Sequence, residues 1–129
     1  MTAALLSAYR RSRYEAAGAM ACIGRRSAGI DALLRSMGVR QGAFITAWNP
    51  MSRCMPMGWN QRMAARLAQQ ARRFPAASGR GGAGRWHEDH LLLGTDPRRV
   101  LVLARRFHQK AIVAVRQGAP ARLLLLHVA

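Results

Sequence analysis

The chain has very few acidic residues. Five Asp and Glu stand against 21 Arg and Lys, which gives a formal net charge of +16. So few acids leave little basis for a catalytic pair of carboxylates. The electrostatic field of so large a positive charge attracts polyanions. Lys110 is the single lysine, so almost all of the positive charge comes from arginine. A coding bias toward Arg and Ala explains this composition more simply than selection for nucleic-acid binding does. Charge alone therefore assigns no partner.

Cysteine is scarce and long apolar runs are missing. Cys22 and Cys54 fit a reducing compartment, and neither requires a disulfide. No apolar run approaches the roughly 20 residues that a membrane helix needs. At the start of the chain, Leu5 and Leu6 precede the arginines, the reverse of a secretory signal. We therefore expect a cytoplasmic protein with no membrane segment.

Familiar catalytic and metal motifs are also missing. There is no Gly-x-Ser-x-Gly elbow, and the glycine-rich stretch 79–85 lacks the Lys and the strand-to-helix context of a phosphate loop. Residues 75–85 are instead predicted to be a flexible loop. His87 and His90 would project to opposite faces of a strand, so no metal site and no cofactor are expected.

Apolar spacing and capping residues predict the secondary structure. The first 13 residues form a short helix or arm, and 14–23 form a strand. Ser27 is an N-cap for a helix over 28–37, and Asp96-Pro97 begins another helix that ends near Phe107. Asn60 is the predicted N-cap of a helix that ends at Phe74. The remaining strands are predicted over 42–48, 86–94, 111–115 and 121–128.

The resulting order, β-α-β-α-β-α-β-β, predicts one α/β domain over residues 1–129, on the border with α+β. Parallel crossovers and a terminal antiparallel hairpin would give a mixed sheet of about five strands with helices packed on it. The predicted core consists of Ile30, Leu33, Leu34, Phe44, Ile45, Leu67, Leu92, Leu103, Phe107, Ile112 and Leu124.

Two groups of polar residues are candidate sites. The first group lies where strands and helices meet, and its side chains could orient a small ligand: Thr46, Asn49, Asn60, Glu88 and Gln109. A purely structural role is equally compatible with these residues, because amides also form turns, cap helices and bond to backbone. The second group is a predicted stripe of arginines on one helix, Arg62, Arg66 and Arg73, which would lie in solvent or contact phosphate.

Several of these residues carry a resemblance. The segment Thr46 to Pro50, together with Asn60, Trp86, Glu88 and the segment Phe107 to Val113, resembles an uncharacterised bacterial protein family, domain of unknown function 3293. The resemblance extends over most of the chain, from about residue 9 to the last strand. The family has no established activity, so the resemblance implies no reaction and no cofactor.

Two functions follow as hypotheses. The first is a binding module that holds an anionic small molecule or a nucleotide at the polar cluster. The alternative is a nucleic-acid-binding protein without sequence preference that uses Arg-rich faces and binds weakly. Few aromatic residues are available for base stacking, because Phe44 and Trp48 belong to an apolar strand, and this favours the first hypothesis. The sequence does not decide whether the protein is an enzyme.

Overall fold

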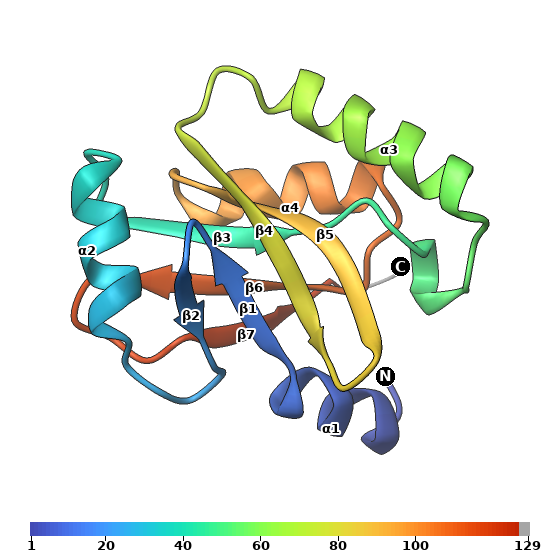
Figure 1. The fold of residues 1–129 in the computed structure, drawn as a ribbon, viewed down its shortest axis with the longest axis horizontal. Helices are drawn as coiled ribbons and strands as arrows, with labels where there is room; N and C mark the ends of the chain where they lie inside the picture. Colours follow the sequence, from blue (N-terminus) through green and yellow to red (C-terminus); the bar gives the residue numbers. More distant parts are fainter. Residues whose placement is uncertain (127–129) are drawn as a thin grey trace.

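A seven-stranded sheet organises the molecule (Figure 1), and its strands pair in the order β2-β1-β4-β5-β3-β6-β7. The computed structural model describes residues 1–126. All six strand pairings are antiparallel. The strands are β1 (Arg13–Ala16), β2 (Ala19–Ala21), β3 (Gln41–Ile45), β4 (Ala76–Ala83), β5 (Trp86–Leu93), β6 (Ala111–Arg116) and β7 (Arg122–Leu125).

The sheet curls until its two ends meet. Ile23, just after β2, forms a β-bridge with Ala121, just before β7. The backbone N–H of Gly24 donates to the carbonyl of Ala121 at 2.8 Å, and the N–H of Ala121 donates to the carbonyl of Arg25 at 3.1 Å. The curled sheet therefore has an inner face and an outer face, as an incomplete barrel does.

Four α-helices and one 3-10 turn surround the sheet: α1 (Ala3–Arg11), α2 (Ala28–Ser36), η1 (Pro50–Ser52), α3 (Met57–Gln70) and α4 (Pro97–Arg106). In Figure 1, α3 and α4 lie on one side of the sheet, α2 lies against the β2 end, and α1 lies below the turn between β4 and β5. Over residues 1–126, no helix combines the length and the apolar character needed to cross a membrane.

The two faces of the sheet bury two separate cores. Tyr14, Phe44 and Leu92 face inward and pack with Leu34 of α2. The outer core joins side chains of β3, β5 and β6 to α3 and α4 through Ile45, Leu93, Leu67, Leu103, Phe107 and Ile112. Alternate residues of each strand serve different cores, as the period of a strand requires. The predicted core is confirmed except for Leu33 and Leu124, which are only half-buried.

The prediction of a mixed α/β domain is confirmed, but the predicted parallel crossovers are wrong. The predicted strand 14–23 is a hairpin, because Ala17 and Gly18 adopt positive φ and reverse the chain. β4 is a further strand between α3 and β5, and an added strand reverses the direction of the one that follows it. The sheet therefore has seven antiparallel strands in place of about five mixed ones.

The prediction of a flexible loop over 75–85 is wrong, because this segment contains β4. This strand pairs with β1 on one side and with β5 on the other. Its glycines permit the close approach. A Cβ at Gly79 would overlap the carbonyl oxygen of Glu15, and one at Gly82 would overlap that of Trp86. The glycine-rich composition indicated a flexible segment. In the structure, glycine is needed at these positions because the neighbouring backbone leaves no room for a side chain.

Several helix predictions are confirmed. The side chain of Ser27 caps α2 and that of Asp96 caps α4, with Pro97 at the first position of the helix. The N-terminal helix and the terminal β6–β7 hairpin are also present. Asn60 is not an N-cap, since α3 begins at Met57 and Asn60 is buried within its first turn. The predicted end of the last strand, at 128, lies outside the described residues.

Candidate ligand-binding cavity

A cavity of about 340 Å³ lies between α1 and the inner face of the curled sheet. Its walls come from five strands, from α1 and from the segment that follows β3. Pockets in the mouths of barrels are frequent binding sites, and this volume is at the small end of the roughly 300–1,000 Å³ that small-molecule sites occupy. The polar side chains in its lining are Tyr9, Ser12, Tyr14, Thr46, Asn49, Ser52, Glu88, His90 and Gln109.

Strained backbone borders this cavity. Asn49, Met51 and Ser52 have φ values of 48°, 52° and 62°, and His108 nearby has a φ of 55°. The N–H of Met51 donates to the carbonyl of His108 at 2.7 Å, so the two strained segments are joined. Non-glycine residues in this region cost about 1–3 kcal/mol each, and such residues cluster at functional sites. The strain motivates a functional role for the cavity.

Asn49 and Asn60 hold this segment in place through reciprocal hydrogen bonds. The side-chain amide of Asn60 donates to Oδ1 of Asn49 at 3.0 Å, and the backbone N–H of Asn49 donates to Oδ1 of Asn60 at 3.0 Å. Oδ1 of Asn49 also accepts from the N–H of Met55 at 2.9 Å. Both amides are buried. Nδ2 of Asn49 is thereby directed to Glu88, whose Oε2 accepts from it at 2.8 Å.

Thr46 and Gln109 connect the cavity wall to its surroundings. Oγ1 of Thr46 donates to the carbonyl of Asp89 at 2.7 Å and accepts from the N–H of Trp48 at 3.1 Å. Nε2 of Gln109 donates to the carbonyl of Trp48 at 3.0 Å and to that of Phe107 at 3.3 Å. These bonds brace the segments after β3 and α4, so both residues have a structural role in addition to lining the cavity.

Burial shifts the protonation of the acid and the imidazole in the cavity. Burial raises the pKa of the Glu88 carboxyl, although hydrogen bonds from Asn49 and Trp86 oppose the shift. Burial lowers the pKa of His90, which favours the neutral ring. Since Nε2 of His90 donates to the carbonyl of Glu15, Nδ1 is left as the acceptor of that ring. Residue 81 has no side chain over this nitrogen, and a Cβ there would lie 2.9 Å from Nδ1.

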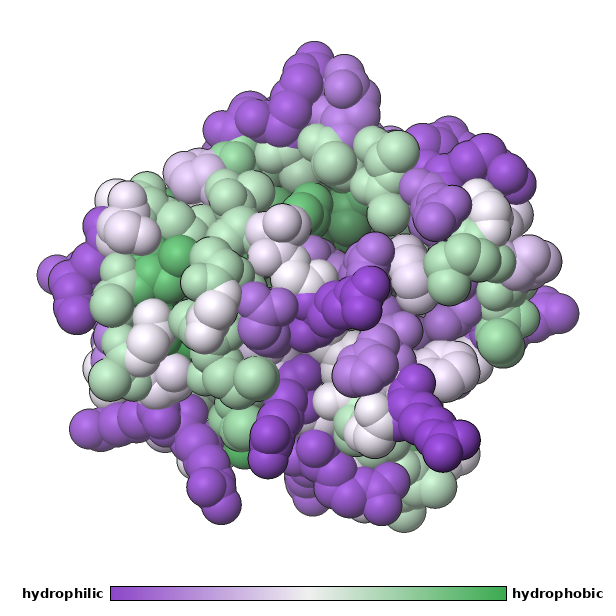
Figure 2. All heavy atoms as spheres, viewed as in Figure 1, coloured by the Kyte–Doolittle hydropathy of each residue, from purple (hydrophilic) through white to green (hydrophobic). Residues whose placement is uncertain are grey.

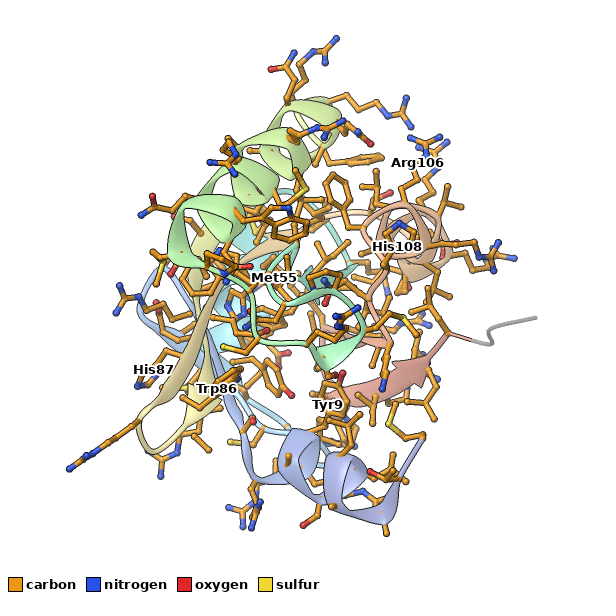
Figure 3. The ribbon with its side chains drawn as sticks, turned by 90° about the vertical axis from the view of Figure 1, so that its right-hand side faces the viewer. Tyr9, Met55, Trp86, His87, Arg106 and His108 are labelled. Atoms are coloured by element: carbon orange, nitrogen blue, oxygen red, sulfur yellow. The ribbon has the colours of Figure 1, made fainter. Side chains whose placement is uncertain are left out.

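Aromatic rings form much of the remaining wall. The rings of Phe44 and His90 have centroids 4.8 Å apart, and the ring of Tyr14 stacks on His90 with centroids 6.3 Å apart. Tyr9 comes from α1 and Trp86 from β5, and Figure 3 shows both on the side of the molecule that α1 covers. Burial raises the pKa of both tyrosines. The site combines flat apolar surfaces with two hydrogen-bond acceptors.

The charge of the cavity differs from that of the whole protein. None of the described residues that line it is Arg or Lys, although the net charge of the chain is +16. Exposed arginines do adjoin lining residues in the sequence: Arg11 and Arg13 flank Ser12, Arg53 follows Ser52, and Arg85 precedes Trp86. The cavity wall therefore contains a carboxyl group, whereas the arginines are next to lining residues in the sequence and are not part of the wall.

The structure brings the five predicted polar residues together. Thr46, Asn49, Glu88 and Gln109 line the cavity, while Asn60 lies behind it and bonds to Asn49. Tyr9, Tyr14 and His90 also line the cavity and were not predicted from the sequence. The alternation of Trp86, Glu88 and His90 along β5 was the signal available, because residues two apart share a face.

The predicted arginine stripe is only partly present. Arg62 and Arg66 are exposed on α3, but α3 ends at Gln70, so Arg73 belongs to the turn that follows. Within residues 1–126, no group of three or more His, Cys, Asp or Glu is arranged to hold a metal ion. His87 is exposed, and in Figure 3 it lies at the outer edge of β5.

Fold and site together define a single-domain mixed α/β protein with a cavity of polar and aromatic side chains under its N-terminal helix. A family model described as Protein of unknown function (DUF3293) matches residues 45–112, just over half of the chain. The chain belongs to this family. The matched region includes Thr46, Asn49, Asn60, Glu88 and Gln109. Comparison with curated proteins and with solved structures finds no match.

Proposed function

We propose that the protein is a binding module for a nucleoside or nucleotide, with the base inside the cavity. The observation that carries the proposal is the partly buried carboxyl of Glu88, held by Asn49 at 2.8 Å in a cavity whose lining includes several aromatic rings. A carboxyl oxygen accepts from ligand N–H groups, and Nδ1 of His90 is a second acceptor. A ligand that fits these groups presents N–H donors on a flat ring, as a nucleobase does.

The charge distribution supports a base inside the cavity rather than a free anion. A phosphate or carboxylate there would meet the Glu88 carboxyl without a lining cation to offset it. The exposed arginines at 11, 13, 53 and 85 adjoin lining residues, which suits a phosphate that remains outside while the base is bound. The runner-up is a small anion that uses these arginines alone.

Because Cys22 and Cys54 are both free, we also propose a cytoplasmic location.

Titration calorimetry with guanosine, adenosine, their monophosphates and inorganic phosphate tests this proposal. We expect at least one nucleoside to bind, its monophosphate to bind more tightly, and Glu88→Gln to weaken binding about tenfold or more, the loss of a hydrogen bond to a charged group. Asp89→Asn is the matched control, because Asp89 is exposed and pairs with Arg80 at 3.2 Å. Phosphate that binds as tightly as the nucleotides, or no nucleoside binding at millimolar concentration, would overturn the proposal.

A further inference from the structure

Arginines from two separate segments converge on one phenyl ring outside the cavity. The guanidinium carbon of Arg73 lies 4.9 Å from the centroid of Phe74, and that of Arg99 lies 6.0 Å from the same centroid. Arg73 follows α3, whereas Arg99 is in the first turn of α4. A shared aromatic ring restrains both side chains, since cations are attracted to the ring face. The two positive charges are thus held together.

A third arginine joins this group from the other end of α4. Nη1 of Arg106 donates to the side-chain oxygen of Gln70, the last residue of α3, at 3.5 Å, and Figure 3 labels Arg106 at the end of α4. Arg99 and Arg106 are seven residues apart, so they share a face of α4 with a spacing of about 10 Å along its axis. We call Arg73, Arg99 and Arg106 the arginine surface. In Figure 2, hydrophilic side chains cover the upper edge of the molecule, where α3 lies in Figure 1.

Little carboxylate charge balances this surface within residues 1–126: Asp96 attracts Arg99, but it forms its ion pair with Arg98. Within residues 1–126, the ion pairs are Arg80 with Asp89 and Arg98 with Asp96. The other three acids lie elsewhere: Glu88 lines the cavity, Glu15 lies on β1, and Asp31 lies on α2. Three cations held together beside a single acid, which is itself paired with Arg98, repel one another, and a bound polyanion would relieve that repulsion.

We infer that the arginine surface binds the phosphate backbone of nucleic acid without reading its sequence. Planar guanidinium groups match phosphate oxygens in paired hydrogen bonds, and three of them over two helical turns meet several phosphates of one strand. Base readout is not expected, because the ring of Phe74 is already occupied by the two guanidinium groups rather than open for stacking. The surface is on the outer face, so its ligand is independent of the one in the cavity.

Fluorescence anisotropy with labelled single-stranded and duplex oligonucleotides of unrelated sequence tests the inference, at salt concentrations from 50 to 200 mM. The triple variant Arg73→Gln, Arg99→Gln, Arg106→Gln should bind all sequences at least tenfold more weakly at low salt. For this variant, the slope of log K against the logarithm of the salt concentration should be less steep by up to about 3. That is roughly one unit for each phosphate that the variant no longer neutralises. Circular dichroism confirms that the variant is folded.

The matched control is Arg25→Gln, Arg26→Gln, Arg40→Gln, which removes the same charge from exposed positions elsewhere. Equal weakening by both variants would show that net charge alone attracts nucleic acid and would overturn the inference. So would vesicles of anionic lipid that capture the protein through the arginine surface while oligonucleotides do not. The triple variant should bind nucleosides in calorimetry as the wild type does, because none of its three positions lines the cavity, so failure here is distinguishable from failure of the nucleoside proposal.

Discussion

At the residue scale, Asn49 links the fold to the site. Its side chain bonds to Met55, Asn60 and Glu88, and its own backbone adopts the left-handed conformation. The same side chain therefore stabilises the loop and fixes the position of the carboxyl in the cavity. Replacement of Asn49 cannot test ligand binding alone, since the loop depends on it.

Asn49→Ala should lower the free energy of unfolding by about 1–3 kcal/mol, the cost of leaving buried polar partners unsatisfied. Asn49→Gly removes the same bonds but tolerates the φ of 48°, so it should be less destabilised than the alanine variant. Urea denaturation of both variants measures the difference. Equal stabilities would show that the left-handed backbone of residue 49 costs little.

Glu88 makes stability depend on pH in a defined direction. Its pKa is raised in the folded protein, so the folded state holds the proton more tightly than the unfolded chain does. The stabilisation is complete below the unfolded pKa of about 4.5 and is lost as pH rises through the folded pKa. His90 acts in the opposite sense, because its lowered pKa costs stability as pH falls below 6.5.

We expect Glu88→Gln to gain stability relative to the wild type as pH is raised from 4.5, because the variant has no carboxyl to ionise. Denaturant titrations of both proteins over a series of pH values measure the gap. Asp89→Asn, whose carboxylate is half-exposed, serves as the control. A difference in stability between wild type and variant that does not change with pH would contradict the raised pKa of the partly buried Glu88 carboxyl.

At the element scale, β4 depends on glycine for its place between β1 and β5. A Cβ at position 79 would overlap the backbone of Glu15. Backbone cannot move aside as the end of a flexible side chain can, so the neighbouring strand itself would have to shift. Gly58 in α3 is a contrasting case, because a Cβ there would lie 3.6 Å from the guanidinium of Arg62.

Gly79→Ala should cost about 1–3 kcal/mol or more through overpacking. Gly58→Ala should instead stabilise the protein by about 0.5–1 kcal/mol, since alanine loses less backbone entropy in a helix. Thermal unfolding of the pair separates the effect of position from that of the amino acid. A Gly79→Ala protein as stable as the wild type would restore the interpretation of 75–85 as a flexible loop.

At the scale of the whole molecule, excess positive charge opposes the compact state. Within residues 1–126, ion pairs involve only two of the basic residues, Arg80 and Arg98, and the five acids of the chain leave a net charge of +16. Self-repulsion of this kind destabilises folding, and salt screens it over about 10 Å at 0.1 M. The same imbalance underlies the affinity that we infer for the arginine surface.

The melting temperature should therefore rise as sodium chloride is increased from about 10 to 300 mM, a range over which screening becomes effective. Scanning calorimetry at fixed pH measures the shift. The triple variant of the arginine surface should melt higher than the wild type at low salt and show a smaller response to it. A melting temperature that is independent of salt would contradict the importance of self-repulsion.

The sequence by itself determined the elements whose signals are local. Apolar spacing and the caps Ser27 and Asp96 identified α2 and α4, because a helix face and a cap are specified within a few residues. Short turns between apolar runs identified the β6–β7 hairpin in the same way. The polar residues of the site were also found from their positions beside strand ends and from the family resemblance.

Only the tertiary structure decided how these pieces were arranged. Whether the glycines of β4 were flexible or crowded depended on strands distant in sequence, since Gly79 is close-packed against Glu15. The directions of the strands followed from this added strand and from the β1–β2 hairpin. The same curled sheet brought Tyr9, Tyr14 and His90 to Glu88 and made polar residues at strand ends into the walls of a cavity. Long-range strand pairing leaves no local pattern, which is why the sequence could not supply this arrangement.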